Sequence, residues 1–392
     1  MNQVQRFFAV LRGEIPDRAP FFPDITTWYQ ASRLGVGTEQ PFYPGQYIPD
    51  SDPIHSKPSA LGGRMGELRF VDFYKEYGWG LPAHIYDWYD ESYEAGAEKI
   101  VETSGRERRV RFRVPGGELC RSYKLDAEGT WSEYGHMVRD LGQLDLVREL
   151  VERTRRTSRP ERVERFLRDT EGFGVCDLVV FRSPFGKLVH EYMGFENVVY
   201  AVTDDEKSVL DFLDFQEYYD LELIGMAAAM PGPIVIISDH ADENLIAPPW
   251  YRKYCMPFYR KACDRLRAAG KYVSTHLDGN FKGFLGFIRE TGFDLLDGCT
   301  PAPMFNYEVE ELAEAIRPSA KVGERPMSCY CGVPAGLFTF GYPRDGISDF
   351  GERIFRAFRG RVIVNVGDIL PPTGDIEAVI ELGRRIESLV DR

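Results

Sequence analysis

The 392-residue chain has few cysteines, a deficit of basic residues and no long apolar run. Seven cysteines are an odd and sparse set for this length, which favours a reduced, cytoplasmic compartment over a disulfide framework. The 48 basic against 61 acidic residues give a net charge of −13, which disfavours nucleic acid and anionic membranes as main partners. No stretch approaches the roughly 20 apolar residues of a membrane helix, and the first residues lack the pattern of a signal peptide.

Common catalytic motifs are missing as well. The sequence contains no G-x-S-x-G, P-loop or H-E-x-x-H motif. Cys329 and Cys331 form C-x-C instead of the C-x-x-C of zinc ribbons, and no second pair follows. What is present is an ordinary globular composition, with 43% hydrophobic and 28% charged residues. These proportions exclude a mainly disordered chain, because such chains are poor in apolar residues.

Strand and helix patterns alternate from about residue 140 onward. Such alternation indicates parallel βαβ units, and the uninterrupted apolar runs fit strands buried on both faces. We therefore expect an α/β fold, a (β/α)₈ TIM barrel, with an open doubly wound sheet as the alternative. Strands are predicted at 19–23, 177–182, 233–239, 271–276, 293–298 and 361–368, with weaker candidates near 82–88 and 320–329. Helices are predicted at 3–12, 143–169, 187–230, 250–269, 281–290, 307–316, 348–359 and 375–390.

Residues 1–392 are expected to form a single domain with an inserted loop and hairpin region at about 40–136. Residues 24–95 are rich in Pro, Gly, Tyr and Trp, which predicts long loops and short helices over the mouth of the barrel. Residues 97–136 instead alternate apolar and polar side chains, and Pro115-Gly116-Gly117 is a hairpin signal. A small antiparallel β-hairpin insertion is therefore predicted there.

The densest group of candidate site residues is S-T-H-L-D-G-N at 274–280. Active sites of barrels form at the carboxyl ends of the strands. His276 and Asp278 are two residues apart at such an end, so their side chains can project together and bind a divalent metal or act as acid and base. Asn280 can cap the next helix. The alternative is that Asp278 and its neighbours form only a turn.

Two other predicted strand ends carry carboxylates. Asp239 begins D-H-A-D-E-N and is the best placed of that group, although a solvated loop of charges is the alternative. Asp368, in N-V-G-D-I-L-P-P, could meet His276 across the mouth. Arg182 could hold an anionic substrate, or it could form a structural salt bridge. The candidate substrate-binding residues are Asp24, Trp28, Arg182, His240, Asn280 and Cys299.

Five segments, spread over nearly the whole chain, stand out together: LRGEIPDRAPFF, VRFRVPGGEL, YMGFENVVYAVTDDEKSVLDFL, KYVSTHLDGNFKGFLGFIRETGFDLLDGCTPAP and VNVGDILPPTGDIEAV. In their order and spacing, more than in any single piece, they resemble the uroporphyrinogen decarboxylase superfamily, which includes corrinoid-dependent methyltransferases. The resemblance implies a (β/α)₈ barrel with its site at the carboxyl-end mouth.

The sequence departs from the family pattern at two places. Uroporphyrinogen decarboxylases carry an Arg-rich segment after the first strand, whereas PDITTWYQASR here contains only Arg33, so porphyrinogens are not expected as substrates. The methyltransferases hold zinc through His-x-Cys and a second Cys near the last strand. This chain has His276-Leu277-Asp278 and Asp368 there. The resemblance thus implies a divalent metal, with zinc the first expectation, bound by one imidazole and two carboxylates.

Three functional hypotheses follow. The first is a metal-dependent methyltransferase that moves a methyl group between a small substrate and a corrinoid (cobalamin) on a partner carrier protein. Asp239 and Glu243 would then be the catalytic acid/base groups. The second is a metal-independent decarboxylase or lyase of a small acid, in which Arg182 or Arg33 holds a carboxylate. The third is a non-catalytic binding protein on the same fold. Metal content separates the first hypothesis from the second.

Overall fold

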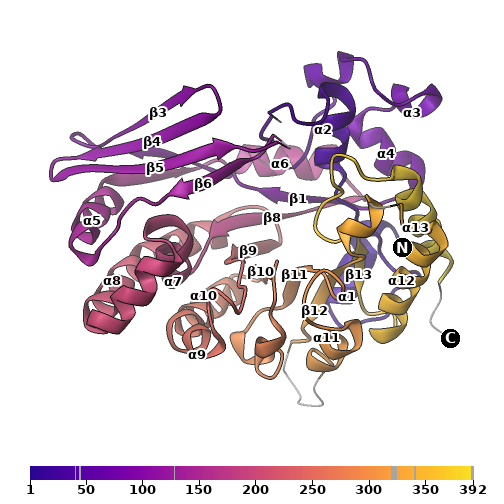
Figure 1. The fold of residues 1–392 in the computed structure, drawn as a ribbon. Helices are drawn as coiled ribbons and strands as arrows, with labels where there is room; N and C mark the ends of the chain where they lie inside the picture. The colour runs from indigo at the N-terminus through magenta and orange to yellow at the C-terminus, as the bar shows by residue number, and fades with distance from the viewer. Residues whose placement is uncertain (40, 44–45, 128, 319–324, 340, 390–392) are drawn as a thin grey trace.

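The computed structural model describes residues 1–39, 41–43, 46–127, 129–318, 325–339 and 341–389, and a curved, seven-stranded parallel sheet runs through its centre (Figure 1). The sequence pattern predicted this α/β arrangement of parallel strands. The strands lie side by side in the order β1 (Leu81–Ile85), β8 (Gly174–Phe181), β9 (Ile234–Ser238), β10 (Tyr272–His276), β11 (Leu295–Cys299), β12 (Ser328–Gly332) and β13 (Ile363–Asn365).

Helices follow most of these strands and lie along the outer side of the curved sheet (Figure 1). Between β10 and β11, however, the chain forms only short 3₁₀ turns, so the helix predicted at 281–290 is wrong. Gly283 and Gly286 explain this, because glycine is a poor helix former. The helices are α7 (Pro184–Lys187), α8 (Phe195–Ala229), α9 (Pro248–Trp250), α10 (Met256–Ala268), α11 (Val309–Ala315), α12 (Arg344–Ala357) and α13 (Ile376–Ser388).

The segment 20–22 connects the two edges of the parallel sheet. The N–H groups of Val364 and Phe22 bond the carbonyls of Pro20 and Val364 at 3.0 and 2.9 Å. On the other side, the N–H of Gly80, just before β1, bonds the carbonyl of Phe21 at 2.8 Å. A strand was predicted at 19–23, and the chain runs parallel to β13 there.

An N-terminal helix, α1 (Gln3–Leu11), closes the amino ends of the strands. Its apolar face packs against side chains that begin the parallel strands and point to the inside of the curve. The carboxyl ends therefore lie on the opposite side, where they are available for a site. The inner cluster consists of Phe7, Val10, Leu11, Phe22, Val175, Ile234, Leu295, Tyr330 and Ile363.

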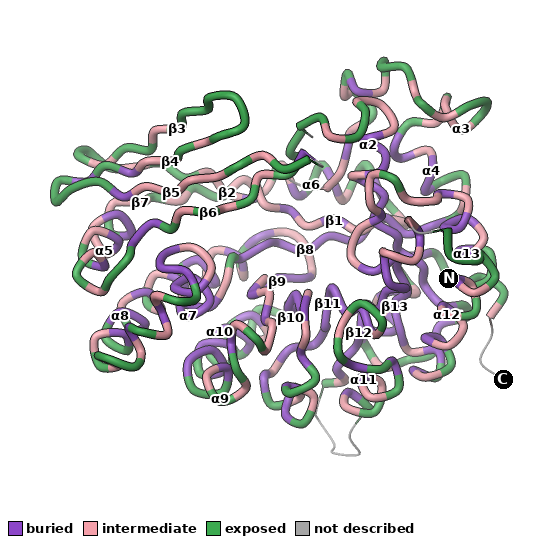
Figure 2. Tube along the Cα trace, viewed as in Figure 1, coloured by how far each residue is buried: buried purple, intermediate pink, exposed green. Residues whose placement is uncertain are grey.

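A separate four-stranded antiparallel sheet lies to one side, next to α5 (Leu144–Arg153) (Figure 1). The predicted Pro-Gly turn joins two of its strands, with Val114 paired to Gly117. Its outer face is largely exposed (Figure 2), whereas Phe112, Val114 and Leu119 are buried. The strands are β3 (Glu98–Ser104), β4 (Glu107–Val114), β5 (Gly117–Leu125) and β6 (Trp131–Gly135).

The single helix predicted at 143–169 is wrong, because a strand divides it. After α5 the chain forms β7 (Thr154–Ser158), which pairs with β2 (Tyr89–Tyr93), and only then α6 (Pro160–Asp169). Two threonines favour the strand, and Pro160 keeps the residue before it out of the helical region.

The first part of the predicted loop region 24–95 forms loops and short helices, α2 (Thr26–Leu34), α3 (Gly63–Glu67) and α4 (Phe70–Tyr77), whereas its last part forms the strands β1 and β2. None of the helices in the described part of the chain combines the length and apolarity that crossing a bilayer requires.

Candidate active site

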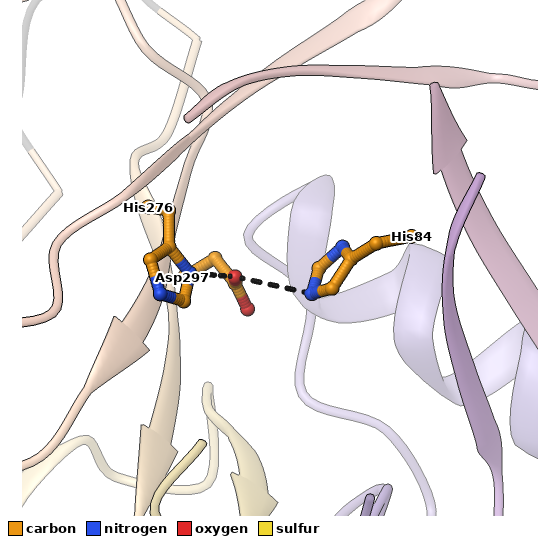
Figure 3. Close-up of side chains that lie close together, drawn as sticks. All are labelled: His84, His276 and Asp297. Carbon is orange, nitrogen blue, oxygen red and sulfur yellow. Dashed lines mark hydrogen bonds and ion pairs between the residues drawn. The ribbon is translucent and has the colours of Figure 1, made fainter. Parts of the chain in front are cut away.

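Two histidines and an aspartate form the centre of the candidate site. His276 ends β10 and Asp297 is its direct neighbour on β11, so the ladder already places them side by side. Asp297 Oδ2 lies 2.7 Å from His276 Nδ1 and 3.6 Å from His84 Nε2. Figure 3 shows the carboxylate of Asp297 between the two imidazole rings. Both histidine side chains are therefore oriented by one buried carboxylate.

A second neighbouring pair extends this network. His84 on β1 faces Asp177 on β8 in register, and its Nδ1 lies 2.8 and 3.0 Å from the two carboxylate oxygens. Sequence reasoning did not select His84, Asp177 or Asp297. Each of them is a polar residue among apolar neighbours within a strand, and this pattern could have pointed to them. A buried polar residue must find a partner, so such a position often belongs to a hydrogen-bonded site.

The charges of this network shift several pKa values. Burial alone would lower the pKa of His84, but Asp177 and then Asp297 outweigh it and raise the pKa to about 10. Burial likewise opposes the charge of Asp297, yet the hydrogen bond with His276 and the charge of His84 hold its pKa below the usual range. Burial raises the pKa of Asp177. His84 is thus a partly buried cation between two carboxyl groups.

A group of possible metal ligands lies at the outer side of His276. His240, His276 and Asp278 each offer a ligand atom, and these atoms lie within 4.8 Å of one another. Asp297 occupies Nδ1 of His276, which leaves Nε2 for an ion, and Nε2 lies 3.8 Å from Oδ1 of Asp368. The structure therefore brings together the three predicted metal ligands, His276, Asp278 and Asp368, and adds His240.

The electrostatics of this group suit a cation. Burial and then the charge of His276 lower the pKa of His240 to about 3, so its ring is neutral at neutral pH. Burial opposes protonation of His276 as well, but Asp368 and Asp297 raise its pKa to about 9. Burial, followed by the charge of Asp368, raises the pKa of Asp278. The negative potential that attracts a proton to His276 also attracts a metal ion.

Three residues at the strand ends have left-handed backbone conformations. Arg182 after β8, His240 after β9 and Asp368 after β13 have φ angles of 48°, 47° and 70°. Such angles are uncommon for residues with a side chain and persist only where the surrounding structure enforces them. The strained backbone turns these side chains at the rim of the sheet, where the candidate ligands gather.

Gly298 allows the His276 ring to approach the backbone of β11. Its φ is +70°, and an added Cβ would lie 2.7 to 3.1 Å from three atoms of the imidazole ring. The same residue lies within a register shift between Leu296 and Cys299. This bulge turns Cys299 to the outer face beside Cys329 and Cys331. Cys299, a predicted pocket residue, is therefore buried away from the histidines.

The predicted catalytic residues Asp239 and Glu243 act in the structure as loop anchors. Asp239 is fully buried, where its carboxylate accepts hydrogen bonds from the Ser183 N–H at 2.9 Å and from the Tyr259 hydroxyl. Glu243 accepts hydrogen bonds from the Gly283 N–H at 2.5 Å and from the amide of Asn306 at 2.6 Å. Neither carboxylate belongs to the groups of possible ligands in the described residues.

The other predicted substrate-binding residues lie partly at the rim of the parallel sheet and partly in the core. Asn280 binds Asp242 through its backbone and side-chain amides, at 3.0 and 3.2 Å, and so joins two rim loops. Asp24 is buried, and burial together with the charge of Asp368 raises its pKa to about 6. Trp28 is buried against Phe73 in the core and does not reach the histidines.

The two candidate arginines have different surroundings. Arg33 donates hydrogen bonds to the carbonyls of Lys57, Gly66 and Leu68 at 2.9, 3.0 and 2.8 Å, so it holds a loop. Arg182 lies 3.6 Å from Glu191. Its guanidinium donates no hydrogen bond to any residue that the structure describes.

Comparisons with known proteins agree with this architecture. The family model for uroporphyrinogen decarboxylase (URO-D) matches residues 179–380, just over half of the chain, including β9 to β13 and their rim loops. The chain belongs to the uroporphyrinogen decarboxylase family. The resemblance noted in the sequence is thereby confirmed, and the family match covers His240, His276, Asp278, Asp297 and Asp368.

A solved structure shows a similar fold at low sequence identity. A methyltransferase from Methanosarcina mazei has a TM-score of 0.57 and 12% identity, and the match covers 98% of each chain. A B12-independent methionine synthase from a Shewanella species, in complex with selenomethionine, has a TM-score of 0.45 and 10% identity, covering 94% of this chain and 96% of that one. No curated protein matches the sequence.

Proposed function

We propose that this member of the uroporphyrinogen decarboxylase family is a metal-dependent enzyme that transfers a methyl group to or from a small molecule. The observation that carries the proposal is the convergence of His240, His276 and Asp278 within 4.8 Å, with His276 Nδ1 held by Asp297. A carboxylate that orients a ligating histidine is a recurrent feature of metal sites. The similar fold of a structure named a methyltransferase supports the class of reaction.

The residues fit a divalent cation. Two imidazoles and one carboxylate are a set that zinc enzymes use while leaving a position open for water or substrate. Asp368, 3.8 Å from His276 Nε2, supplies a second carboxylate at the rim. Imidazole and carboxylate ligands also suit manganese, cobalt or iron. Zinc is therefore the first ion to test, and these three are the next. Bound there, the ion would act as a Lewis acid on the leaving group or the acceptor.

The chain's own residues have separable roles in this proposal. Asp297 holds the tautomer of His276 that presents Nε2 to the ion. His84 and Asp177 keep the charge of Asp297 balanced from the other side. The participant that exchanges the methyl group would be a corrinoid on a partner carrier protein, an expectation that comes from the family resemblance. A reduced cytoplasmic compartment, inferred from the cysteine content, is part of the same proposal.

We further propose that residues 1–392 form one closed (β/α)₈ barrel carrying the region 40–136 as an insertion. The hydrogen bonds that segment 20–22 makes to both β13 and Gly80 support an eighth strand position between the sheet edges. A closed barrel would gather all strand ends around one mouth, which is how residues from β1, β8, β10 and β11 could serve a single site.

The experiment is a measurement of bound metal on protein purified without chelator. We expect one divalent ion per chain by elemental analysis, and its loss in His276→Ala with an unchanged far-ultraviolet circular dichroism spectrum. His136→Ala is the matched control, because His136 belongs to neither ligand group. Transfer of the methyl group from free methylcobalamin to a small thiol, followed by the visible absorbance of the cobalamin, then tests the reaction. Protein that neither contains nor takes up zinc, cobalt or manganese would refute the metal-dependent function.

A metal-independent lyase is the second candidate, and one observation favours it. The His84, Asp177 and Asp297 network is charge-balanced by a histidine whose pKa is raised to about 10, so it needs no metal ion. A cationic histidine next to a substrate could stabilise developing negative charge. Turnover of a small carboxylic acid by metal-free protein would select this function.

A further inference from the structure

A cavity of about 560 Å³ lies between the four-stranded sheet and the parallel sheet, outside the group of possible metal ligands. Its walls come from β2 to β7, from α5, from the segment 181–192 and from α8. Pockets for small organic ligands have volumes of roughly 300–1,000 Å³. The space is thus large enough for a whole small molecule.

Aromatic rings make up much of the wall. Tyr93, Phe112, Tyr123, Trp131 and Phe181 line the cavity from separate strands. Phe181 ends β8, remains 38% exposed and stacks on Tyr86 at a centroid distance of 5.6 Å. Flat aromatic walls favour a ligand with an aromatic or similarly flat apolar body, because ring pairs gain stacking energy beyond their buried area.

The charged residues of the wall favour an anion. Five cationic side chains line the cavity against three carboxylates, in a protein whose net charge is −13. Most of these cations already have close partners. Arg121 binds Glu133 through two hydrogen bonds of 2.9 and 2.5 Å, and Arg156 binds Glu91 at 3.1 Å. Lys187 donates to the buried Asp220, which lies behind the wall.

Arg182 is the lining guanidinium whose hydrogen-bonding capacity is least used. Its contact with Glu191 is 3.6 Å, beyond hydrogen-bonding distance, and its Nε is buried without a partner. Buried atoms of two adjacent lining residues, Nε2 of His190 and Oε1 of Glu191, also lack hydrogen-bond partners. Buried polar atoms are rarely left unpaired in proteins, so this part of the wall has polar groups that the chain itself does not satisfy.

The position of Arg182 connects the cavity with the metal ligands. It directly follows Phe181, which pairs in register with Ser238 on β9, two residues before His240. The strained backbone at Arg182 and at His240 turns both chains at the same rim. Arg182 and His190 are also close enough to His240 to lower its pKa. A molecule in the cavity could therefore extend toward His240.

We propose that this cavity binds the substrate, and that the substrate is a small molecule with a flat aromatic body and a carboxylate that pairs with Arg182. This inference rests on the proposed function only in calling the bound molecule a substrate. Arg182 offers the planar, two-donor geometry that a carboxylate matches.

The test is binding of p-methoxybenzoate to the full chain, compared with neutral methoxybenzene, by calorimetry and by the fluorescence of Trp131. We expect the anion to bind about tenfold or more tightly than the neutral compound. Arg182→Gln should remove that preference, while Arg353→Gln, an exposed arginine on α12, should leave it unchanged. Trp131→Phe should abolish the change in fluorescence without abolishing the heat of binding.

A second variant, expected to raise the affinity instead of lowering it, keeps the test valid if Arg182→Gln misfolds. Glu191→Gln removes the carboxylate that competes for Arg182, so we expect it to bind p-methoxybenzoate more tightly than the unaltered protein. Equal affinity for anion and neutral compound, no binding of the anion, or no change in Glu191→Gln would each overturn the inference. Because binding is read without metal or methyl transfer, a failure here is distinguishable from a failure of the proposed function. If His276→Ala, which should hold no metal, still binds p-methoxybenzoate, the cavity binds the anion independently of the metal site.

Discussion

Asp297 accepts a hydrogen bond from Nδ1 of His276 at 2.7 Å, and the two residues are also direct partners across the β10–β11 ladder. The orientation of the ring is thus fixed twice, by the backbone register and by a buried carboxylate. Its free nitrogen is left toward His240, Asp278 and Asp368. A pair of adjacent strands is enough to orient one candidate metal ligand.

The first prediction concerns this orienting carboxylate. Asp297→Ala should weaken divalent metal binding by about 10- to 100-fold, the usual effect of removing a carboxylate that holds a ligating histidine. The dissociation constant of zinc or cobalt, from calorimetric titration, measures it. Asp264→Ala, an exposed aspartate on α10, is the control and should bind metal normally. Unchanged affinity in Asp297→Ala would show that His276 does not depend on Asp297.

The second prediction ranks the metal affinities contributed by Asp278 and Asp368, the two carboxylates that, by the resemblance to the methyltransferases, stand in the place of thiolates. Asp278 belongs to the close ligand group, whereas Asp368 is 38% exposed and 3.8 Å from His276 Nε2. Asp278→Asn should therefore cost more metal affinity than Asp368→Asn, by at least about 1.4 kcal/mol, or tenfold. Replacing both with cysteine should retain metal and shift the preference toward zinc, because thiolates are softer ligands. A reversed order of the two variants would place the ion nearer Asp368.

The third prediction tests the close approach of His276 to β11. In Gly298→Ala the new methyl group would meet the imidazole ring at about 3 Å, so the ring must move and metal affinity should fall. Gly105→Ala is a matched control, since Gly105 also has a positive φ, +59°, but an added Cβ there meets nothing within 4 Å. Both variants should lose about 1–2 kcal/mol of stability to the backbone conformation. Equal metal affinity in the two variants would show that contact with the ring is unimportant.

Local patterns were sufficient for most of the parallel strands. The apolar runs at β8 and β9 are buried on both faces, which is why the sequence alone predicts these strands to within a few residues. The local signs that divide the predicted helix 143–169, two threonines and Pro160, are weak beside its helical pattern, and β7 forms by pairing with β2. Whether such a segment becomes a helix or a strand depends on a pairing partner that is distant in the sequence.

The candidate site was predictable only where the ligands follow strands in obvious polar clusters, as His276 and Asp278 do. His84, Asp177 and Asp297 lie inside strands, and their significance comes from register between neighbours. Cys299 was misplaced because a bulge at Gly298 reverses the side on which the next residue points. Asp239 follows an apolar strand as expected, yet hydrogen bonds from Ser183 and Tyr259 hold it in the interior.

The fourth prediction is that the protein does not decarboxylate uroporphyrinogen, despite its family. A porphyrinogen carries several carboxylates that need free cations, and Arg33 is committed to three backbone carbonyls. Incubation with uroporphyrinogen and chromatographic separation of the products is the measurement. A known uroporphyrinogen decarboxylase under the same conditions is the positive control. Products with fewer carboxylates would show that other residues supply the missing cations.

The fifth prediction concerns the buried ion pair of Lys187 and Asp220, whose side chains are 7% and 1% exposed. Lys187→Met or Asp220→Leu alone should destabilise the protein by about 3–5 kcal/mol, because each leaves an uncompensated buried charge. The double variant replaces both charges with apolar groups and should recover most of that loss. The surface pair of Lys261, 55% exposed, and Glu217 is the control, and Lys261→Met should cost less than about 1 kcal/mol. Urea unfolding followed by tryptophan fluorescence gives the free energies. A double variant as unstable as the sum of the single ones would mean that the two side chains act independently and that the pair is not what stabilises the contact between α7 and α8.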